Sequence, residues 1–310
     1  MRIATMATGG IGGYLAVRLG QRGHDIACIA RGPHLAAIRA AGLRLDTPTG
    51  TELFTPAIAT DTPAEIGPVD AVIFGVKGGG LEAAAAACRP LIGPDTVVVP
   101  FLNGVEAADR LAAILPPQNV ANGVAYVFTT ITEPGVIGQT GRAGMHGRFV
   151  FGERDNRPTD RIAALRTAIR DAGPDAPDVD DIEAEVWTKF VLFSAMSGVT
   201  AGARCRIGDI RAHPDLLALF ERVMEETEAV GRARGVALPS DVVARHMAFM
   251  EGAPADARAS TSVDLEKGAP LETPWLNGAV VRLGAEAGVQ TPANAAIAAL
   301  LAPYVAGMSG

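Results

Sequence analysis

Short apolar runs rich in β-branched residues alternate with alanine-rich helical stretches over the first hundred residues. Glycine or proline flanks each helical stretch, as expected where helices begin and end. This alternation is typical of parallel β-α-β units, so we expect an α/β domain built on a parallel sheet. The expected strands are residues 2–6, 25–30, 71–76 and 96–101, and the expected helices are residues 10–22, 33–41, 79–91 and 105–115.

The spacing of apolar residues changes between residues 123 and 152, where strand-like runs follow one another closely. The expected strands here are residues 124–130, 136–140 and 148–151. We expect them to form an antiparallel extension that closes the sheet. Earlier in the chain, the turn sequence T-P-T-G at residues 47–50 separates two short alternating runs and predicts a small hairpin.

A domain boundary is expected at residues 171–181, where aspartate and proline replace the apolar pattern. Beyond it apolar residues recur at helical spacing, and one helix is expected from Pro214 to Gly235. Two threonine–proline pairs predict helix N-termini with a threonine N-cap and a proline in the first turn: Thr273-Pro274 and Thr291-Pro292. Because 310 residues are many for one core, we expect two domains, residues 1–175 and an all-α domain at 181–306.

Composition excludes some classes of partner. The net charge is −7 and the isoelectric point is near 5.3, which argues against nucleic acid and against an anionic membrane surface. The three cysteines are widely spaced and form no C-x-x-C pattern, so we expect reduced thiols in a cytoplasmic protein. The first apolar run is too short for a signal peptide. Five scattered histidines form no H-x-x-x-H pair, and no metal site is expected.

A glycine-rich turn follows the first expected strand and opens the first expected helix. Its sequence, A-T-G-G-I-G, comprises Ala7, Thr8, Gly9, Gly10, Ile11 and Gly12. Glycines here let a backbone approach a pyrophosphate and let the helix pack on the strand, while the helix N-terminus offers N–H groups to the anion. Alanine replaces the first glycine of the pattern and fits the turn if its φ is negative. We therefore expect a Rossmann-type dinucleotide-binding domain; a plain glycine-rich β-α turn is the alternative.

The residue after the second expected strand indicates which dinucleotide binds. A free ribose hydroxyl usually meets an acidic side chain there, but this chain has Arg31. A guanidinium can form two hydrogen bonds with a 2′-phosphate, so NADP(H) is favoured over NAD(H); the alternative is an arginine that solvates a loop. Lys77 follows another expected strand, at the sheet edge where ligands of open α/β sheets bind.

An isolated lysine lies in the apolar segment from residue 183 to 204. Lys189 is the sole charged residue between Val186 and Ala203, in a chain with 24 arginines and three lysines. Burial lowers the pKa of a lysine, which makes it a proton donor near neutral pH, whereas arginine keeps its proton. We interpret Lys189 as a general acid in a buried helix; a lysine that snorkels to the surface is the alternative.

Several motifs stand in one order along the chain: A-T-G-G-I-G from Ala7, I-A-R-G from Ile29, V-K from Val76, L-N-G-V from Leu102, W-T-K-F from Trp187, and S-T-S-V-D with L-E-T-P-W-L-N-G between Ser260 and Gly278. This ordered set resembles the ketopantoate reductase family, the 2-dehydropantoate 2-reductases, from residue 1 to about 304. The resemblance implies a Rossmann domain joined to a helical domain of the 6-phosphogluconate dehydrogenase C-terminal type. It also implies NADPH-dependent reduction of a small 2-oxo acid in the cleft between them, ketopantoate to pantoate in pantothenate biosynthesis.

The resemblance also implies roles for individual residues. The implied catalytic residues are Lys189 as proton donor, Glu272 and Asn103. The implied substrate-binding residues are Ser260, Ser197 and Asn277, and Glu272 is implied to contact the substrate as well. The implied cofactor-binding residues are Ala7, Thr8, Gly9, Gly10, Ile11, Gly12, Arg31, Lys77, Asn103 and Glu272.

Two positions depart from the family pattern, in which asparagines follow the catalytic lysine by four and by eight residues. Phe193 and Ser197 occupy those places. Phenylalanine removes a polar contact to the hydroxylated end of pantoate, so a different or more apolar 2-oxo acid stays open as the substrate. A β-hydroxyacid or opine-type dehydrogenase and a non-catalytic NADP(H) sensor are further alternatives. The apolar helical domain is compatible with a homodimer.

Overall fold

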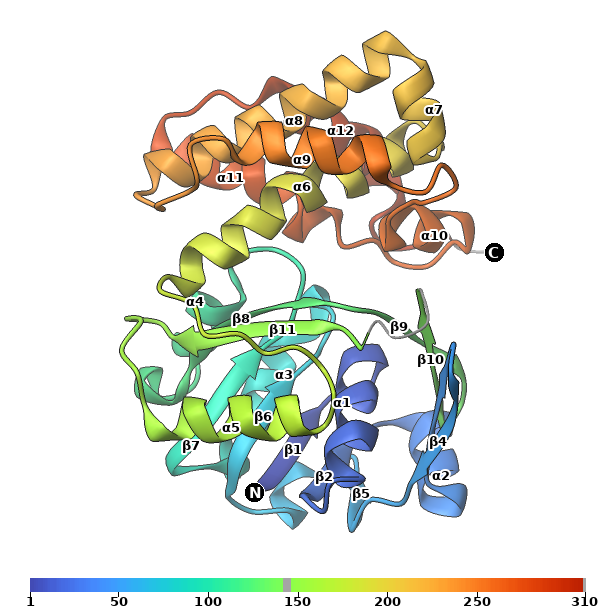
Figure 1. Cartoon of the computed structure of the whole chain (residues 1–310), viewed down its shortest axis with the longest axis vertical. Coiled ribbons are helices and arrows are strands. Elements are labelled where there is room, and N and C mark those ends of the chain that lie inside the picture. The colour runs from blue at the N-terminus through green and yellow to red at the C-terminus, as the bar shows by residue number, and fades with distance from the viewer. Residues whose placement is uncertain (142–145, 309–310) are drawn as a thin grey trace. The chain divides into compact units, whose positions relative to one another are not determined.

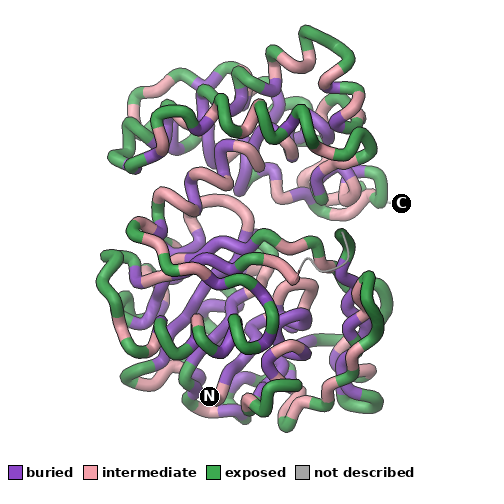
Figure 2. Tube along the Cα trace, viewed as in Figure 1, coloured by how far each residue is buried: buried purple, intermediate pink, exposed green. Residues whose placement is uncertain are grey.

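The computed structural model describes residues 1–141 and 146–308. The chain forms two compact units, which we describe separately. Unit 1 comprises Met1–Leu102 and Glu106–Ile182, and unit 2 comprises Asn103–Val105 and Glu183–Gly310. Buried residues concentrate in the central strands of unit 1 and in the inner helices of unit 2 (Figure 2). The short segment Asn103–Val105 belongs to unit 2, although in the sequence it lies between the two parts of unit 1.

Unit 1 is built on a five-stranded parallel sheet (Figure 1). Its order is β5 (Ile58–Thr60), β2 (Asp25–Ile29), β1 (Arg2–Met6), β6 (Val69–Phe74) and β7 (Ile92–Pro100). Near-continuous apolar runs form these strands because helices cover both faces of a parallel sheet. The predicted α/β architecture is confirmed. The order reverses direction between β1 and β6, which is where ligands bind in open α/β sheets.

The helices of unit 1 are close to those expected, with one addition. They are α1 (Gly10–Gly20), α2 (Gly32–Ala41), α3 (Leu81–Cys88), α4 (Ala107–Ala112) and α5 (Asp160–Asp171). The amphipathic α5 has no counterpart among the expected helices; it lies with α1 over the same face of the sheet (Figure 1).

The remaining strands form two sheets of their own, one of them mixed because β3 and β10 pair in parallel, so the expected antiparallel closure of the parallel sheet is wrong. One sheet has the order β4 (Gly50–Phe54), β3 (Leu43–Thr47), β10 (Val136–Thr140), β9 (Phe128–Glu133), and the other pairs β11 (Arg148–Glu153) with β8 (Ala121–Tyr126). The single strand expected at 124–130 is two strands in different sheets, of which β8 is mostly buried and β9 mostly exposed. The expected hairpin at residues 47–50 is confirmed as the β3–β4 turn.

Helix α1 packs on two sheets through glycines on different faces. A Cβ at Gly12 would lie 2.4 Å from the carbonyl oxygen of Ala7, so this glycine lets the helix approach the parallel sheet. A Cβ at Gly10 would lie 2.5 Å from the carbonyl oxygen of Thr129 in β9, and one at Gly13 would lie 2.6 Å from Ile137 in β10. The sequence G-G-I-G-G thus allows β9 and β10 to pack closely against α1.

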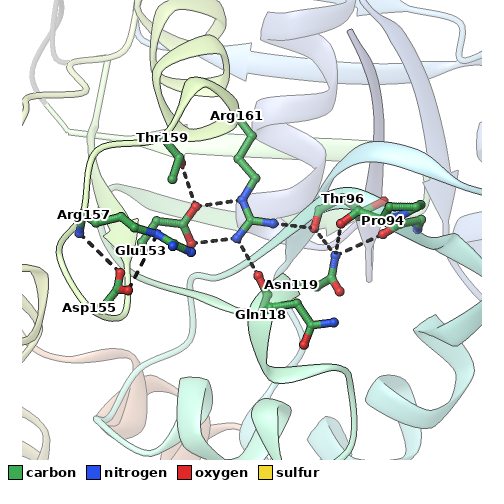
Figure 3. Close-up of polar contacts among 10 residues, drawn as sticks. Pro94, Thr96, Gln118, Asn119, Glu153, Asp155, Arg157, Thr159 and Arg161 are labelled. Carbon is green, nitrogen blue, oxygen red and sulfur yellow. Dashed lines mark hydrogen bonds and ion pairs between the residues drawn. The ribbon is translucent and has the colours of Figure 1, made fainter.

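Arg161 of α5 joins the helix to three other segments of unit 1 (Figure 3). Its guanidinium donates to both carboxylate oxygens of Glu153 in β11 at 2.7 Å each. It also donates to the backbone oxygens of Thr96 and Gln118. Burial by itself raises the pKa of Glu153. Hydrogen bonds from Arg161 and from Thr159 outweigh that effect and hold the pKa of Glu153 below its ordinary value.

The regular elements of unit 2 over residues 183–308 are all helices, in agreement with the expected all-α domain. Its helices are α6 (Ile182–Gly202), α7 (Ile207–Ala212), α8 (Pro214–Ala233), α9 (Val242–Gly252), α10 (Ser260–Glu266), α11 (Asn277–Ala287) and α12 (Pro292–Leu301). Thr273-Pro274 begins only a 3₁₀ turn, Thr273–Trp275, so the helix start expected there is wrong and α11 begins at Asn277. Among residues 1–141 and 146–308, we find no helix that is long and apolar enough to cross a membrane.

The N-terminus of α12 is capped by a side chain from another helix. Glu226 of α8 is 6% exposed and accepts hydrogen bonds from the backbone N–H groups of Ala293 and Asn294 at 2.9 and 3.0 Å. These are the donors that an N-cap side chain would bind. Thr291 occupies the N-cap position without a side-chain cap. The predicted helix start, with Thr291 at the N-cap and proline in the first turn, is confirmed, but Glu226 and not the threonine side chain binds these donors.

Candidate active site

The glycine-rich turn connects β1 to α1 in a conformation that the sequence argument did not expect. Ala7 has a φ of 63°, in the left-handed region, so the expectation of a negative φ is wrong. That conformation costs an alanine roughly 1–2 kcal/mol. The surrounding contacts fix it: the first turn of α1 lies directly on the Ala7 carbonyl, at a distance that only Gly12 permits. The chain direction required by the turn therefore overrides the preference of Ala7.

The backbone of this turn, rather than its side chains, is available to an anion. Thr8 is 2% exposed, and its hydroxyl lies 2.8 Å from the hydroxyl of Thr5 and 3.1 Å from the carbonyl oxygen of Ile29. At Gly9 a Cβ would meet nothing within 4 Å. Helix α1 starts directly after it and has no acidic residue in its first turn. An uncapped N-terminus beside an open glycine fits a pyrophosphate.

Arg31 and Lys77 lie at the same sheet edge as the turn. Arg31 follows β2 at the N-cap of α2, and Lys77 follows β6; both are exposed. Since β2 and β6 flank β1 in parallel pairing, their carboxyl ends and the glycine turn share one edge. The structure thus brings together the cofactor-binding residues expected in unit 1, at the point where the strand order reverses.

A hydrogen-bonded chain in unit 2 connects the three residues implied to be catalytic. The Lys189 ammonium donates to Oδ1 of Asn103 at 3.2 Å, and Nδ2 of Asn103 donates to Oε2 of Glu272 at 3.4 Å. The side-chain amide thus lies between a cation and an anion and presents the matching pole to each. Gly104 has a φ of 95°, and a Cβ there would lie 2.6 Å from the carbonyl oxygen of Trp275. Glycine after Asn103 therefore allows this loop to approach the segment that carries Glu272.

The environment of Lys189 makes its ammonium a stronger acid than that of an ordinary lysine. Burial lowers the pKa of Lys189 to about 8, against the opposing effect of the Glu272 carboxylate. The ring of Phe193, one helical turn onward, lies with its centroid 5.0 Å from the ammonium, which is a cation–π distance. The lysine keeps partial exposure. A lysine with this pKa can hold a proton at neutral pH and release it to an alkoxide.

The three residues implied to bind substrate have different surroundings. Ser260 is exposed at the start of α10. The preceding residue, Ala259, donates its backbone N–H to the Thr200 hydroxyl of α6 at 3.5 Å. Ser197 lies on α6 with a buried hydroxyl that has no partner among the described residues. Each can still offer a hydroxyl to a ligand, Ser197 only after a local rearrangement.

Asn277, the third residue implied to bind substrate, lies in the interior of unit 2. It is 1% exposed, and its Nδ2 donates to the Ser194 carbonyl at 3.2 Å and to Oδ1 of Asn294 at 2.9 Å. Asn294 in turn donates to Glu226. Both N–H donors of Asn277 are therefore used inside a buried network that joins α6, α11 and α12. Nothing in the sequence indicated this network, because the partners of Asn277 are far away in the chain.

Sequence reasoning also missed His34, which contacts the glycine turn. Its Nε2 lies 2.8 Å from the carbonyl oxygen of Thr8, and its Nδ1 accepts the Gly135 N–H at 2.9 Å. The one available signal was its position three residues after Arg31, in the first turn of α2.

Known proteins resemble this chain in sequence and in fold. A family model described as ketopantoate reductase PanE/ApbA matches residues 3–156, and one described as ketopantoate reductase PanE/ApbA C terminal matches residues 181–305. A 2-dehydropantoate 2-reductase of Mesorhizobium japonicum is 34% identical to this chain, over 97% of each protein. A PanE/ApbA family ketopantoate reductase structure from Ralstonia eutropha JMP134 gives a TM-score of 0.89 at 33% identity, over 98% of each chain.

A D-mandelate dehydrogenase structure with NADH and anilino(oxo)acetate gives a TM-score of 0.87 at 21% identity, over 98% of each chain, a likeness that shows the fold alone. The two family models together cover most of both units. The chain therefore belongs to the ketopantoate reductase family and is an NAD(P)-dependent oxidoreductase.

Proposed function

We propose that this protein reduces a 2-oxo acid to the 2-hydroxy acid with NADPH, and that ketopantoate, which yields pantoate for pantothenate synthesis, is the first candidate substrate. The observation that carries the proposal is the chain Lys189, Asn103, Glu272, which holds a lysine with a pKa of about 8 against an amide and a carboxylate. Membership of the family and the name of the Mesorhizobium relative support the same reaction.

Each residue of this chain has its own role in the proposed reaction. Bound NADPH supplies a hydride to the carbonyl carbon. The Lys189 ammonium hydrogen-bonds to the carbonyl oxygen, stabilises the negative charge that develops there and transfers its proton to the alkoxide. Asn103 orients the ammonium, and the Glu272 carboxylate favours its charged form. Neutral Lys189 then regains a proton from solvent, which completes the cycle.

The preference for NADPH rests on Arg31. Its exposed guanidinium follows β2, where the ribose of a dinucleotide is recognised. Charged hydrogen bonds of this kind contribute about 1.5–3 kcal/mol, or roughly 10–100-fold in binding. We expect Arg31→Ala to lower the NADPH-over-NADH ratio of kcat/KM by that factor, while Arg39→Ala, an exposed arginine on the same helix, leaves it unchanged. An unchanged ratio in Arg31→Ala would contradict the NADPH assignment.

Phe193 favours a second candidate, a 2-oxo acid with an apolar side chain. The ring is half-buried beside the Lys189 ammonium and offers no hydrogen bond to a hydroxylated substrate. A panel of 2-oxo acids that includes ketopantoate and 4-methyl-2-oxopentanoate separates the two candidates by kcat/KM. We expect Phe193→Asn to shift the ratio toward ketopantoate. The apolar candidate fails if wild type prefers ketopantoate and the substitution does not change the ratio.

The deciding test of the function is the loss of NADPH absorbance with this panel. Lys189→Ala should lower kcat by about 10² or more and leave NADPH binding intact, because general acids contribute that much. Lys267→Ala, which removes an exposed lysine of the same unit, is the matched control. Tight NADPH binding without turnover of any 2-oxo acid would instead indicate a sensor, and turnover only of 3-hydroxy acids with NADP⁺ would indicate a β-hydroxyacid dehydrogenase.

A further inference from the structure

We propose that His34 is a positioning residue for the dinucleotide: it fixes the peptide that opens the glycine turn and joins that turn to the β9–β10 hairpin. The inference rests on the proposed function, since it assumes that NADPH binds at this turn. His34 lies in the first turn of α2 and touches neither of the reacting groups named above. It reaches two backbone groups that are distant in the chain, the Thr8 carbonyl and the Gly135 N–H.

The two partners determine the tautomer of His34. A backbone N–H can only donate, so Nδ1 accepts from Gly135 at 2.9 Å. Nε2 then carries the hydrogen and donates to the Thr8 carbonyl oxygen at 2.8 Å. One neutral ring therefore serves a donor and an acceptor at once, a pairing that few other side chains can reproduce.

The Thr8 carbonyl matters because it sets the direction of the next N–H group. The peptide between Thr8 and Gly9 is planar, so its C=O and N–H point in opposite directions. The Thr8 N–H donates to the Ile29 carbonyl at 2.8 Å, and its hydroxyl lies 3.1 Å from the same oxygen. With His34 on the carbonyl, every polar group of Thr8 is held. The Gly9 N–H is thereby aimed away from His34, on a residue where a Cβ would meet nothing within 4 Å.

An independent contact brings the same hairpin to the other side of the turn. The Thr129 backbone in β9 lies so close to α1 that a Cβ at Gly10 would be 2.5 Å from its carbonyl oxygen. Gly135 lies in the turn between β9 and β10. The hairpin thus contacts the start of α1 through β9 and contacts Thr8 through His34. This second sheet is one wall of the dinucleotide site, an element that the glycine motif alone does not include.

The test compares variants that differ in their ability to donate and accept. A glutamine amide offers one donor and one acceptor at similar reach, an asparagine is one carbon shorter, and leucine offers neither. We expect His34→Leu to weaken NADPH binding at least tenfold by fluorescence titration, while kcat at saturating NADPH and the KM for the 2-oxo acid stay within twofold of wild type. His34→Gln should restore binding to within about threefold of wild type. His24→Leu, at a half-buried histidine of the same unit, is the matched control.

Equal NADPH affinity in wild type and His34→Leu overturns the proposal, as does equal weakening in the leucine and glutamine variants. If His34→Leu does not fold, the glutamine and asparagine variants decide: normal binding in the first and weakened binding in the second support the proposal, and equal binding overturns it. A wild-type protein that binds no NADPH contradicts the proposed function as well, so the two failures are distinguishable.

Discussion

Replacing Glu272 with glutamine tests how the proton on Lys189 is controlled. The substitution removes the negative charge and keeps an oxygen that can accept from Nδ2 of Asn103, as Oε2 does now at 3.4 Å. Burial lowers the pKa of Lys189 to about 8, and the carboxylate opposes that effect. Without the carboxylate, the effect of burial on the pKa of Lys189 is opposed less strongly. The ammonium should therefore lose its proton at a lower pH than in wild type.

The geometry gives the size of this effect. The Lys189 ammonium lies 3.2 Å from one end of the Asn103 amide and the Glu272 carboxylate lies 3.4 Å from the other end, so the two charges are roughly 6–9 Å apart given standard amide dimensions. At an effective dielectric constant of about 20, unit charges at that separation attract by about 2 kcal/mol. Both side chains keep partial exposure, which reduces the attraction. One pH unit corresponds to about 1.4 kcal/mol, so we expect a change of about one pH unit.

The assay is the pH dependence of kcat/KM for the 2-oxo acid at saturating NADPH. Wild-type kcat/KM should fall as pH rises through about 8, because the acid must be protonated. In Glu272→Gln the same fall should lie about one pH unit lower. Glu286→Gln, at an exposed carboxylate of α11, is the matched control and should leave the profile unchanged. A profile for Glu272→Gln that coincides with wild type, or lies at higher pH, would refute the assignment of Lys189 and Glu272.

Three further predictions concern stability, measured by urea unfolding. Lys189→Met should stabilise the fold by about 1–3 kcal/mol at pH 7, because the folded lysine has a pKa of about 8 and an unfolded one about 10.4. The stability of wild type should approach that of the variant as pH rises from 8 to above 10. A stability difference that stays constant with pH would contradict this prediction. Glu226→Gln should cost about 2 kcal/mol, since it leaves the N-terminal donors of α12 poorly paired, and the exposed Glu225→Gln should cost under about 0.5 kcal/mol; equal costs would argue against the cap. Glu153→Gln should cost about 2–4 kcal/mol at pH 7; because the pKa of Glu153 is lowered by folding, this difference should shrink as pH falls below about 4, and its persistence there would refute the role of the carboxylate.

Structural features that depend on short segments of sequence were predicted correctly. The parallel strands, the helical second unit and the unusual setting of Lys189 all follow from the order of apolar residues in short segments. The two separate sheets do not, because strand pairing joins β3 to β10 in parallel across about ninety residues. The close packing of β9 and β10 on the glycines of α1 accompanies that pairing. The sequence did not indicate this packing, because glycines in a fingerprint motif are interpreted as cofactor-binding residues.

The same distinction between local and distant contacts applies to the candidate site residues. Asn103, Lys189 and Glu272 meet as the family resemblance implied, although they are 86 and 169 residues apart in their two contacts. Asn277 belongs to a buried network that its own motif does not show, because its two acceptors come from α6 and α12. His34 was missed for the same reason. A side chain that binds distant backbone groups leaves no spacing signal near it.

The alanine at position 7 shows why a dinucleotide turn can depart from its sequence pattern and keep its geometry. An anion at this turn would be held by backbone N–H groups, so a side chain matters only where its Cβ would collide or where φ is positive. Position 12 excludes any side chain, since a Cβ would lie 2.4 Å from the Ala7 oxygen, and position 9 is open. Ala7 itself needs only a left-handed φ, a strain of roughly 1–2 kcal/mol that the contacts of Thr8 and Gly12 can hold. The pattern therefore tolerates alanine at its first position and not at its last, and a motif search that weights all three glycines equally would undervalue this chain.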